Sequence, residues 1–332
     1  MTDLFAYSAS EAAQQVVNAL SLGSVYALLG IGVAAVFSVL GLINFAHGEL
    51  VTIAGFVMLL MRNNDIPWPI VVPTAIIAAG LAAIVMERVA FRPVRGAPVI
   101  TLLLTSLGLS LVIQNLLLIF VGARGKNLRV GDWSNATFDV GGVIVKWFDV
   151  ATVITTFVAL FLLTTFLHKS VRGLALRAAA EDFTMTRMMG IRANSVITGA
   201  FVVSGLLAGI AAFFFLGTLG QVGYDYGFTP LLKGFIAAVI GGLGSLSGAA
   251  VGGFLLAALE IFFQVTLPAA DTPFTTAIVF AIIVAVGWRS VQNRRILRMQ
   301  AADGQETIVV AGEDGGELRG SVEQLLEGPH SL

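Results

Sequence analysis

The sequence predicts an all-α polytopic membrane protein, and three observations predict it: the composition, the length of the apolar segments and the placement of the basic residues. Hydrophobic residues make up 57% of the 332 residues and charged residues only 12%, and the mean hydropathy is +0.91. A water-soluble domain covers its core with a polar surface, so this composition is typical of a chain that is dissolved in lipid. We expect eight or nine transmembrane helices, some of them short or broken.

Apolar segments follow one another along the chain, and crossing a bilayer takes roughly 20 helical residues. The predicted spans are 16–42, 70–86, 99–121, 148–167, 196–216, 249–267 and 274–288, with shorter apolar segments at 50–61 and 231–240. The segment 50–61 is long enough to cross only if residues 45–49 belong to its helix. The count is nine if 231–243 crosses and eight if one short segment is re-entrant.

The basic residues give the chain an orientation. Arginine and lysine gather at 88–95, 169–192 and 289–298, and the positive-inside rule places these segments in the cytoplasm. The loops 62–69, 122–147 and 217–229 then face outward, as does the N-terminus. We divide the chain into an external segment 1–15, a transmembrane permease domain 16–288 with a cytoplasmic loop 169–194, and a cytoplasmic tail 289–332. The tail is polar and glycine-rich, so we expect it to be largely disordered.

The sequence offers little support for catalysis in this chain. It has no cysteine and only three scattered histidines, which excludes disulfides and gives no metal-ligand spacing. The nearest string to a phosphate-binding loop, residues 122–127, lacks the spacer and the final Ser or Thr. If ATP drives transport, another chain therefore binds it.

The most informative polar segment is 172–191, which lies between two predicted spans. Residues 178–182 favour a helix that stops at Gly190, with an apolar face formed by Met185, Met188 and Met189. A short cytoplasmic helix of this kind can insert into a groove of a partner protein. It can also lie along lipid headgroups.

Two apolar segments, 32–58 and 234–257, are each interrupted by polar or glycine residues. Unwound backbone at membrane depth is tolerated where it lines a cavity, so the interruptions point to a substrate path. The candidate residues there are Asn44, His47, Glu49, Gly241, Gly242 and Gly244. The alternatives are helix caps, hydrogen bonds between helices and glycine-driven helix packing.

Glu260 lies inside its predicted span, roughly 18 Å from the cytoplasmic end at the helical rise. It can meet a substrate ammonium group or a polar group of a neighbouring helix. Gln114 and Asn115 interrupt the span 99–121, and we expect them to form hydrogen bonds between helices. In the outer loop, residues 139–145 are predicted to form a small hairpin.

Three of these segments, 41–49, 177–191 and 241–253, resemble the LIV-type permeases of ABC importers for branched-chain amino acids, specifically the LivH-like subunit. The resemblance extends over residues 16–288. It implies that 177–191 is the counterpart of the loop whose coupling helix docks on an ATPase. The residues to which it assigns this coupling are Arg177, Ala180, Glu181, Asp182 and Gly190. The order Ala-Ala-Glu-Asp at 179–182 differs from the Glu-Ala-Ala of the general importer pattern.

The resemblance also implies partners. They are a second, LivM-like permease, two ATPase subunits that bind the ATP, and an external solute-binding protein, all at a bacterial inner membrane with the C-terminus of this chain in the cytoplasm. Branched-chain or other neutral amino acids are the expected solutes, and urea or short amides are the alternative within the same subfamily. An ATP-independent channel or carrier and a membrane scaffold are the other classes. No metal, cofactor or nucleic acid is expected.

Overall fold

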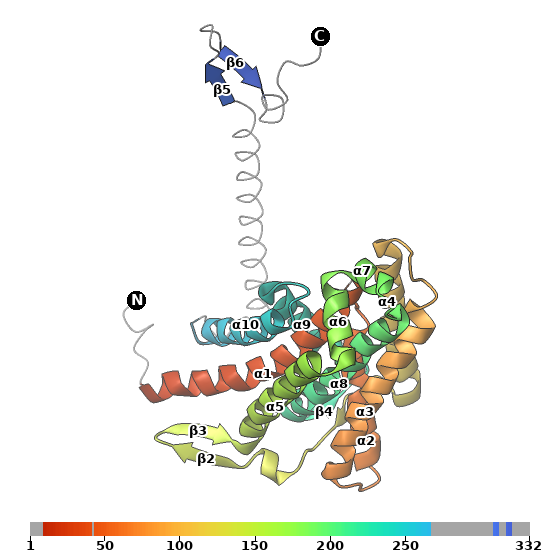
Figure 1. The fold of residues 1–332 in the computed structure, drawn as a ribbon. Helices are drawn as coiled ribbons and strands as arrows, with labels where there is room; N and C mark the ends of the chain where they lie inside the picture. Colours follow the sequence, from red (N-terminus) through yellow and green to blue (C-terminus); the bar gives the residue numbers. More distant parts are fainter. Residues whose placement is uncertain (1–8, 42, 267–307, 312–316, 321–332) are drawn as a thin grey trace. The chain divides into compact units, whose positions relative to one another are not determined.

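The computed structural model describes residues 9–41, 43–266, 308–311 and 317–320 (Figure 1). Residues 1–275 and 276–332 form two separate units. The predicted span 274–288 and the arginines at 289–298 lie outside the described residues. In the second unit, the strands β5 (Ile308–Ala311) and β6 (Glu317–Gly320) pair antiparallel.

The first unit is built from helices. The long ones are α1 (Ala9–Leu40), α3 (Trp68–Met86), α4 (Val99–Val121), α5 (Trp147–Lys169), α8 (Ala193–Leu219) and α10 (Leu246–Thr266). The shorter ones are α2 (His47–Arg62), α6 (Val171–Glu181), α7 (Phe183–Met188) and α9 (Phe228–Gly241). Six helices in the described residues are long and apolar enough to cross a membrane. The chain is therefore a polytopic membrane protein of the all-α class, as predicted.

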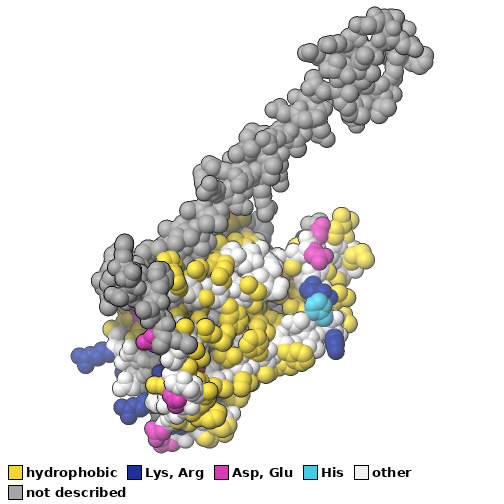
Figure 2. All heavy atoms as spheres, turned by 90° about the vertical axis from the view of Figure 1, so that its left-hand side faces the viewer, with side chains coloured by type: hydrophobic (Ala, Val, Ile, Leu, Met, Phe, Trp, Pro, Cys, Tyr) yellow, Lys and Arg dark blue, Asp and Glu magenta, His cyan; other side chains and the backbone are white. Residues whose placement is uncertain are grey.

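The surface agrees with this assignment. Figure 2 shows a face whose middle is covered by hydrophobic side chains, with basic and acidic side chains gathered toward its two sides. Helix α4 is mostly exposed, so much of its apolar surface is available to lipid or to another subunit. The reason is that a membrane helix needs no polar outer face.

Helix α1 is the centre of the packing. It contacts α5, α8, α9 and α10 (Figure 1), and Leu28 and Leu29 in its middle are fully buried. Its contact with α10 is close because Gly253 has no side chain. A Cβ at that position would lie 2.4 Å from the backbone nitrogen of Ala27. Small residues bring membrane helices together in this way.

One end of the bundle collects the loops that were predicted to face outward. The predicted hairpin is confirmed as β2 (Thr137–Val140) paired with β3 (Val143–Lys146), beyond the short 3₁₀ helix η3 (Asp132–Ser134). Strand β1 (Lys126–Asn127) pairs with β4 (Gln221–Val222), which joins the loops after α4 and α8. Gln14 of α1 is hydrogen-bonded to the backbone of Ile144 at 2.8 and 2.9 Å. These loops and the start of α1 therefore share one side.

The other end carries α6, α7 and the π-helical turn η2 (Glu87–Phe91) that follows α3. The segment predicted as one helix with a glycine stop is instead two helices. Asp182 separates them, because its carboxylate accepts a hydrogen bond from the Met185 backbone at 2.9 Å and so caps α7. Gly190, with φ of +81°, ends the segment as predicted.

Candidate functional site

The first interrupted segment, between α1 and α2, brings its three predicted polar residues into the protein interior. Asn44, His47 and Glu49 are all buried. The Asn44 side-chain oxygen accepts a hydrogen bond from the backbone of Ala46 at 3.0 Å, which shapes the turn into α2. His47 Nδ1 lies 2.9 Å from the Ser204 hydroxyl on α8. The interruption therefore ties α2 to the core of the bundle.

Glu49 connects α2 to the exposed helix α4. Its Oε1 accepts hydrogen bonds from Ser110 at 2.8 Å and from Gln114 at 2.7 Å. The predicted hydrogen bond between helices is confirmed for Gln114. Asn115 instead donates to the carbonyl of Leu111 in its own helix at 2.7 Å, so the prediction for that residue is wrong.

Each of the three buried residues also keeps one polar atom without a hydrogen-bond partner in the described part of the chain. These atoms are Asn44 Nδ2, His47 Nε2 and Glu49 Oε2. A buried polar atom without a partner is costly and rare in native proteins. Unused hydrogen-bonding capacity therefore remains at the start of α2, at His47, which faces α8, and at Glu49, which faces α4.

The second interruption is a tight turn between α9 and α10. Gly242 and Gly244 have φ of +93° and +96°, values that favour glycine. Gly241 packs directly against the carbonyl of Gly248, where a Cβ would lie 1.9 Å from the oxygen. The predicted break is confirmed at these glycines.

A cavity of about 590 Å³ lies between this turn and helix α6. Gly244 lines it together with three of the residues to which coupling was assigned, Arg177, Ala180 and Glu181. The structure therefore brings together parts of the two predicted sets, substrate path and coupling. The cluster around His47 and Glu49 does not line this cavity, nor does Glu260.

Helix α6 is fixed to the end of α5. Arg177 Nε donates a hydrogen bond to the carbonyl of Leu167 at 3.0 Å, and the Ser170 hydroxyl accepts one from the Gly173 backbone at 2.9 Å. Gly173 lies so close to α5 that a Cβ would be 2.2 Å from the Phe166 carbonyl oxygen. On α7 and just after it, the predicted methionine face is exposed at Met185, Met188 and Met189.

Glu260 of α10 is buried with both carboxylate oxygens bound by neighbouring helices. Lys233 of α9 donates to Oε1 at 2.7 Å, and the Tyr26 hydroxyl of α1 donates to Oε2 at 2.9 Å. Lys233 was not among the site residues predicted from the sequence. A lysine within an apolar segment is rare, and this rarity could have identified it. The network links three helices around one neutralised charge pair.

The end of α3 carries a second ion pair. Glu87 binds Arg95 and also accepts a hydrogen bond from Thr198 of α8 at 2.9 Å. Burial lowers the pKa of Arg95, and the neighbouring Glu87 carboxylate opposes this shift. The described residues contain no group of three or more metal-ligating side chains.

The sequence as a whole matches a known family. The family described as "Branched-chain amino acid transport system / permease component" matches residues 15–287. The chain is 36% identical over 266 residues to the high-affinity branched-chain amino acid transport system permease protein BraD of Pseudomonas aeruginosa, covering 75% of this chain and 85% of that protein. It is 34% identical to LivH of Salmonella typhimurium and 33% to LivH of Escherichia coli, each over 82% of this chain and 92% of the relative. The chain therefore belongs to the family of branched-chain amino acid transport system permease components.

Proposed function

We propose that this chain is a permease subunit of an ABC importer that moves branched-chain or other neutral amino acids across a bacterial inner membrane. The family match over residues 15–287, with relatives of this named activity above 30% identity, carries the proposal. It makes the chain a transport subunit rather than an enzyme. The ATP would be bound by two separate ATPase subunits. A second, LivM-like permease and an external solute-binding protein complete the complex.

We place the helices in the membrane with eight or nine crossings and the C-terminus in the cytoplasm. The grouping of the loops supports this topology, because the loops after α4 and α8 are paired through β1 and β4 at one end. The arginine-bearing segments around η2, α6 and α7 lie at the other. The positive-inside rule makes this second end cytoplasmic.

Energy coupling would pass through α6 and α7. The exposed residues there, Glu181, Asp182 and the three methionines, form the surface that an ATPase contacts. Arg177 and Gly173 hold α6 against α5, so a push on α6 moves the inner end of α5. The cavity between α6 and the turn at Gly244 leaves room for this motion, and Gly190 allows the chain to return into α8.

The substrate path would include the two interruptions. Asn44, His47 and Glu49 contribute buried polar atoms without partners, and Gly241, Gly242 and Gly244 contribute a backbone turn at the inner end of a span. We include Glu260 in this set because its buried carboxylate already binds one ammonium group, that of Lys233. In this arrangement a solute ammonium group would compete with Lys233 for the carboxylate.

The solute is tested on the external solute-binding protein that we propose as a partner of this chain. We expect leucine, isoleucine or valine to bind it and to be taken up by cells that express the complete complex. Binding of urea or short amides, with no amino acid bound, would replace the amino-acid assignment with the amide alternative. Uptake that persists without any ATPase subunit would show a carrier instead.

The coupling surface is tested separately by co-purification of the ATPase. Glu181→Arg should reduce the amount of ATPase that co-purifies with the permease, because it reverses an exposed charge at the proposed contact. Lys169→Gln, at the exposed end of α5, is the matched control and should retain the ATPase. Equal association of both variants would remove Glu181 from the contact surface.

A further inference from the structure

A large groove opens at the basic end of the bundle, on the side of α5 and α8. Its volume is about 1340 Å³, and it is a different cavity from the one that joins α6 to the Gly244 turn. Five arginines from three parts of the chain line it: Arg88, Arg92, Arg172, Arg187 and Arg192. No acidic residue of the described part of the chain lines it. The groove is therefore a concentration of positive charge.

These arginines are not neutralised by the described part of the protein. All five are exposed, and the ion pairs formed by described residues are Arg95 with Glu87 and Lys233 with Glu260. Glu87, which lies beside Arg88 in the chain, is already engaged by Arg95 and Thr198. The groove thus has capacity for an anion, and guanidinium groups bind phosphate well because they offer paired N–H donors.

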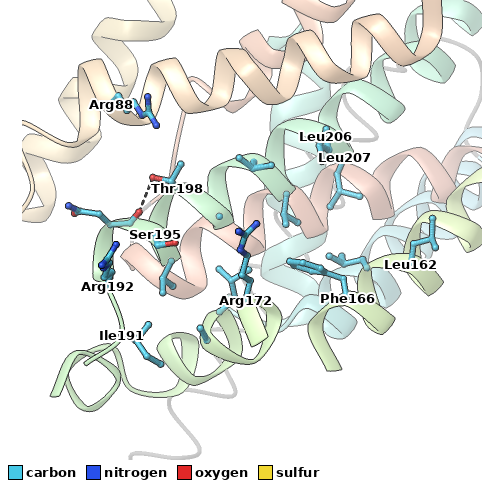
Figure 3. Close-up of a pocket in the computed structure, with 18 of the residues that line it drawn as sticks. Arg88, Leu162, Phe166, Arg172, Ile191, Arg192, Ser195, Thr198, Leu206 and Leu207 are labelled. Carbon is cyan, nitrogen blue, oxygen red and sulfur yellow. Dashed lines mark hydrogen bonds between the residues drawn. The ribbon is translucent and has the colours of Figure 1, made fainter. Parts of the chain in front are cut away.

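The rest of the groove is apolar. Its walls include Leu162 and Phe166 of α5 and Leu206 and Ile210 of α8. Figure 3 shows Arg88 and Arg192 toward one end and Leu162, Leu206 and Leu207 toward the other, with Arg172 between them. Leu162 lies seven residues before the end of α5 and Leu206 thirteen residues after the start of α8, which corresponds to roughly 10 and 20 Å of helix.

The two parts have the layout of a phospholipid at the edge of a bilayer. Helices α5 and α8 are both candidate spans, so the apolar walls face hydrocarbon while the arginines lie at the ends of the spans, at headgroup depth. A soluble partner can reach the arginines but not apolar walls at membrane depth. Free phosphate would leave those walls without an occupant. A ligand with a phosphate and an acyl chain fits both parts.

We propose that this groove binds an anionic phospholipid of the membrane leaflet at the basic end, with its phosphate held by Arg88, Arg172 and Arg192 and an acyl chain along Leu162 and Leu206. Arg172 opens α6 and Arg192 precedes α8. The bound lipid would therefore connect the cytoplasmic helices to two spans. Basic pockets between membrane helices are the usual sites for such headgroups.

The absence of cysteine makes a local probe possible. A Leu162→Cys variant of the full chain carries a single thiol, which is labelled with a small fluorophore. The protein is reconstituted in phosphatidylcholine vesicles that contain either brominated phosphatidylglycerol or brominated phosphatidylcholine, because bromine quenches nearby fluorescence. A label at Leu104→Cys of α4 is the matched control, since Leu104 is 61% exposed and Leu162 is 60% exposed.

We expect the label at position 162 to be quenched more strongly by phosphatidylglycerol than by phosphatidylcholine, and the label at 104 to show no preference. In the labelled background, Arg88→Gln, Arg172→Gln and Arg192→Gln should each reduce the preference about fivefold, the effect of one basic residue near an anionic lipid surface. Lys169→Gln, whose side chain does not line the groove, should keep it. Quenching by brominated phosphatidylcholine shows that each variant is inserted in the vesicle membrane.

Three results would overturn the proposal. Equal quenching by the two lipids at position 162 would show that the arginines select no headgroup. The absence of quenching by either lipid would show that protein covers the groove. Loss of the preference on adding inorganic phosphate, with quenching otherwise unchanged, would show that the basic end takes a free anion instead of a lipid.

Discussion

At the scale of single residues, the network of Glu260, Lys233 and Tyr26 is the most informative part of the structure. A charge inside a membrane span is costly unless it is paired, and here the carboxylate has a cation on one oxygen and a hydroxyl on the other. Lys233 also lies over the ring of Tyr26, with 5.6 Å between the ammonium nitrogen and the ring centroid. The pair holds α9 and α10 on α1.

Removing one member of this pair should cost more stability than removing both. Glu260→Gln removes the carboxylate to which the buried Lys233 ammonium donates at 2.7 Å, and we expect a loss of about 3–5 kcal/mol in the free energy of unfolding. The double variant Glu260→Gln with Lys233→Met should recover most of it. Thermal unfolding in detergent measures both.

Uptake by the double variant then separates packing from solute binding. Normal stability with lost uptake would show that the pair contacts the solute. Normal stability with normal uptake would show that it serves only to join the helices, and Glu260 would leave the proposed path.

Glu49 of α2 receives hydrogen bonds from side chains of another helix, α4. Gln114→Leu removes one of the two donors to its Oε1 and leaves Ser110, and we expect a loss of about 0.5–1.5 kcal/mol, the net contribution of one hydrogen bond. Asn115→Leu is the matched control, because Asn115 is exposed and bonds only within α4. Equal melting temperatures for the two variants would contradict the contact between α2 and α4.

At the scale of elements, the junction between α5 and α6 is fixed by close packing. Gly173 allows α6 to begin directly against the last turn of α5, and no side chain can be added there without moving the helix. Arg177 adds a hydrogen bond to the same turn. The two helices should therefore move as one unit.

Gly173→Ala should uncouple transport from ATP hydrolysis, because the added methyl group pushes α6 away from α5. We expect the reconstituted complex to keep its ATPase activity while uptake falls at least several-fold. The control is Gly108→Ala in α4, since no atom of the described residues lies within 4 Å of a Cβ at Gly108. Parallel loss of hydrolysis and uptake would mean that the substitution disrupts assembly instead.

The helices themselves could be predicted closely from the sequence. Helix α4 coincides with the predicted span 99–121, because its apolar residues end at a glycine with φ of +93° and need no tertiary contact to define them. The turn at Gly241 to Gly244 and the hairpin of β2 and β3 were likewise encoded locally. Each of these depends on residues that are adjacent in the chain.

The missing details depend on residues far apart in the sequence. The pairing of β1 with β4 joins residues about a hundred positions apart, and the partner of Glu260 is on another helix. The π-helical turn after α3 has no sequence signal that we could use. The cavity that both Glu181 and Gly244 line also forms only when α6 packs against the other helices.

At the scale of the whole molecule, the orientation in the membrane is open to direct test. A single cysteine at Val140, which is exposed in the β2–β3 hairpin, should react with a membrane-impermeant maleimide in intact cells. One at Met189, which is also exposed and lies at the opposite end, should react only after the cells are permeabilised. The reverse pattern would invert the topology, and with it the assignment of α6 and α7 to the ATPase.

The short pairing of β1 with β4 also limits how this bundle can rearrange. Lys126 to Asn127 and Gln221 to Val222 are paired, and the next residue, Leu128, is buried and donates a hydrogen bond to Gly220 at 2.9 Å. The chain just after α4 is therefore fastened to the chain just after α8. A transport cycle that keeps these bonds would hold α4 and α8 together at this end and allow the largest displacements at the opposite end, which carries η2, α6 and α7.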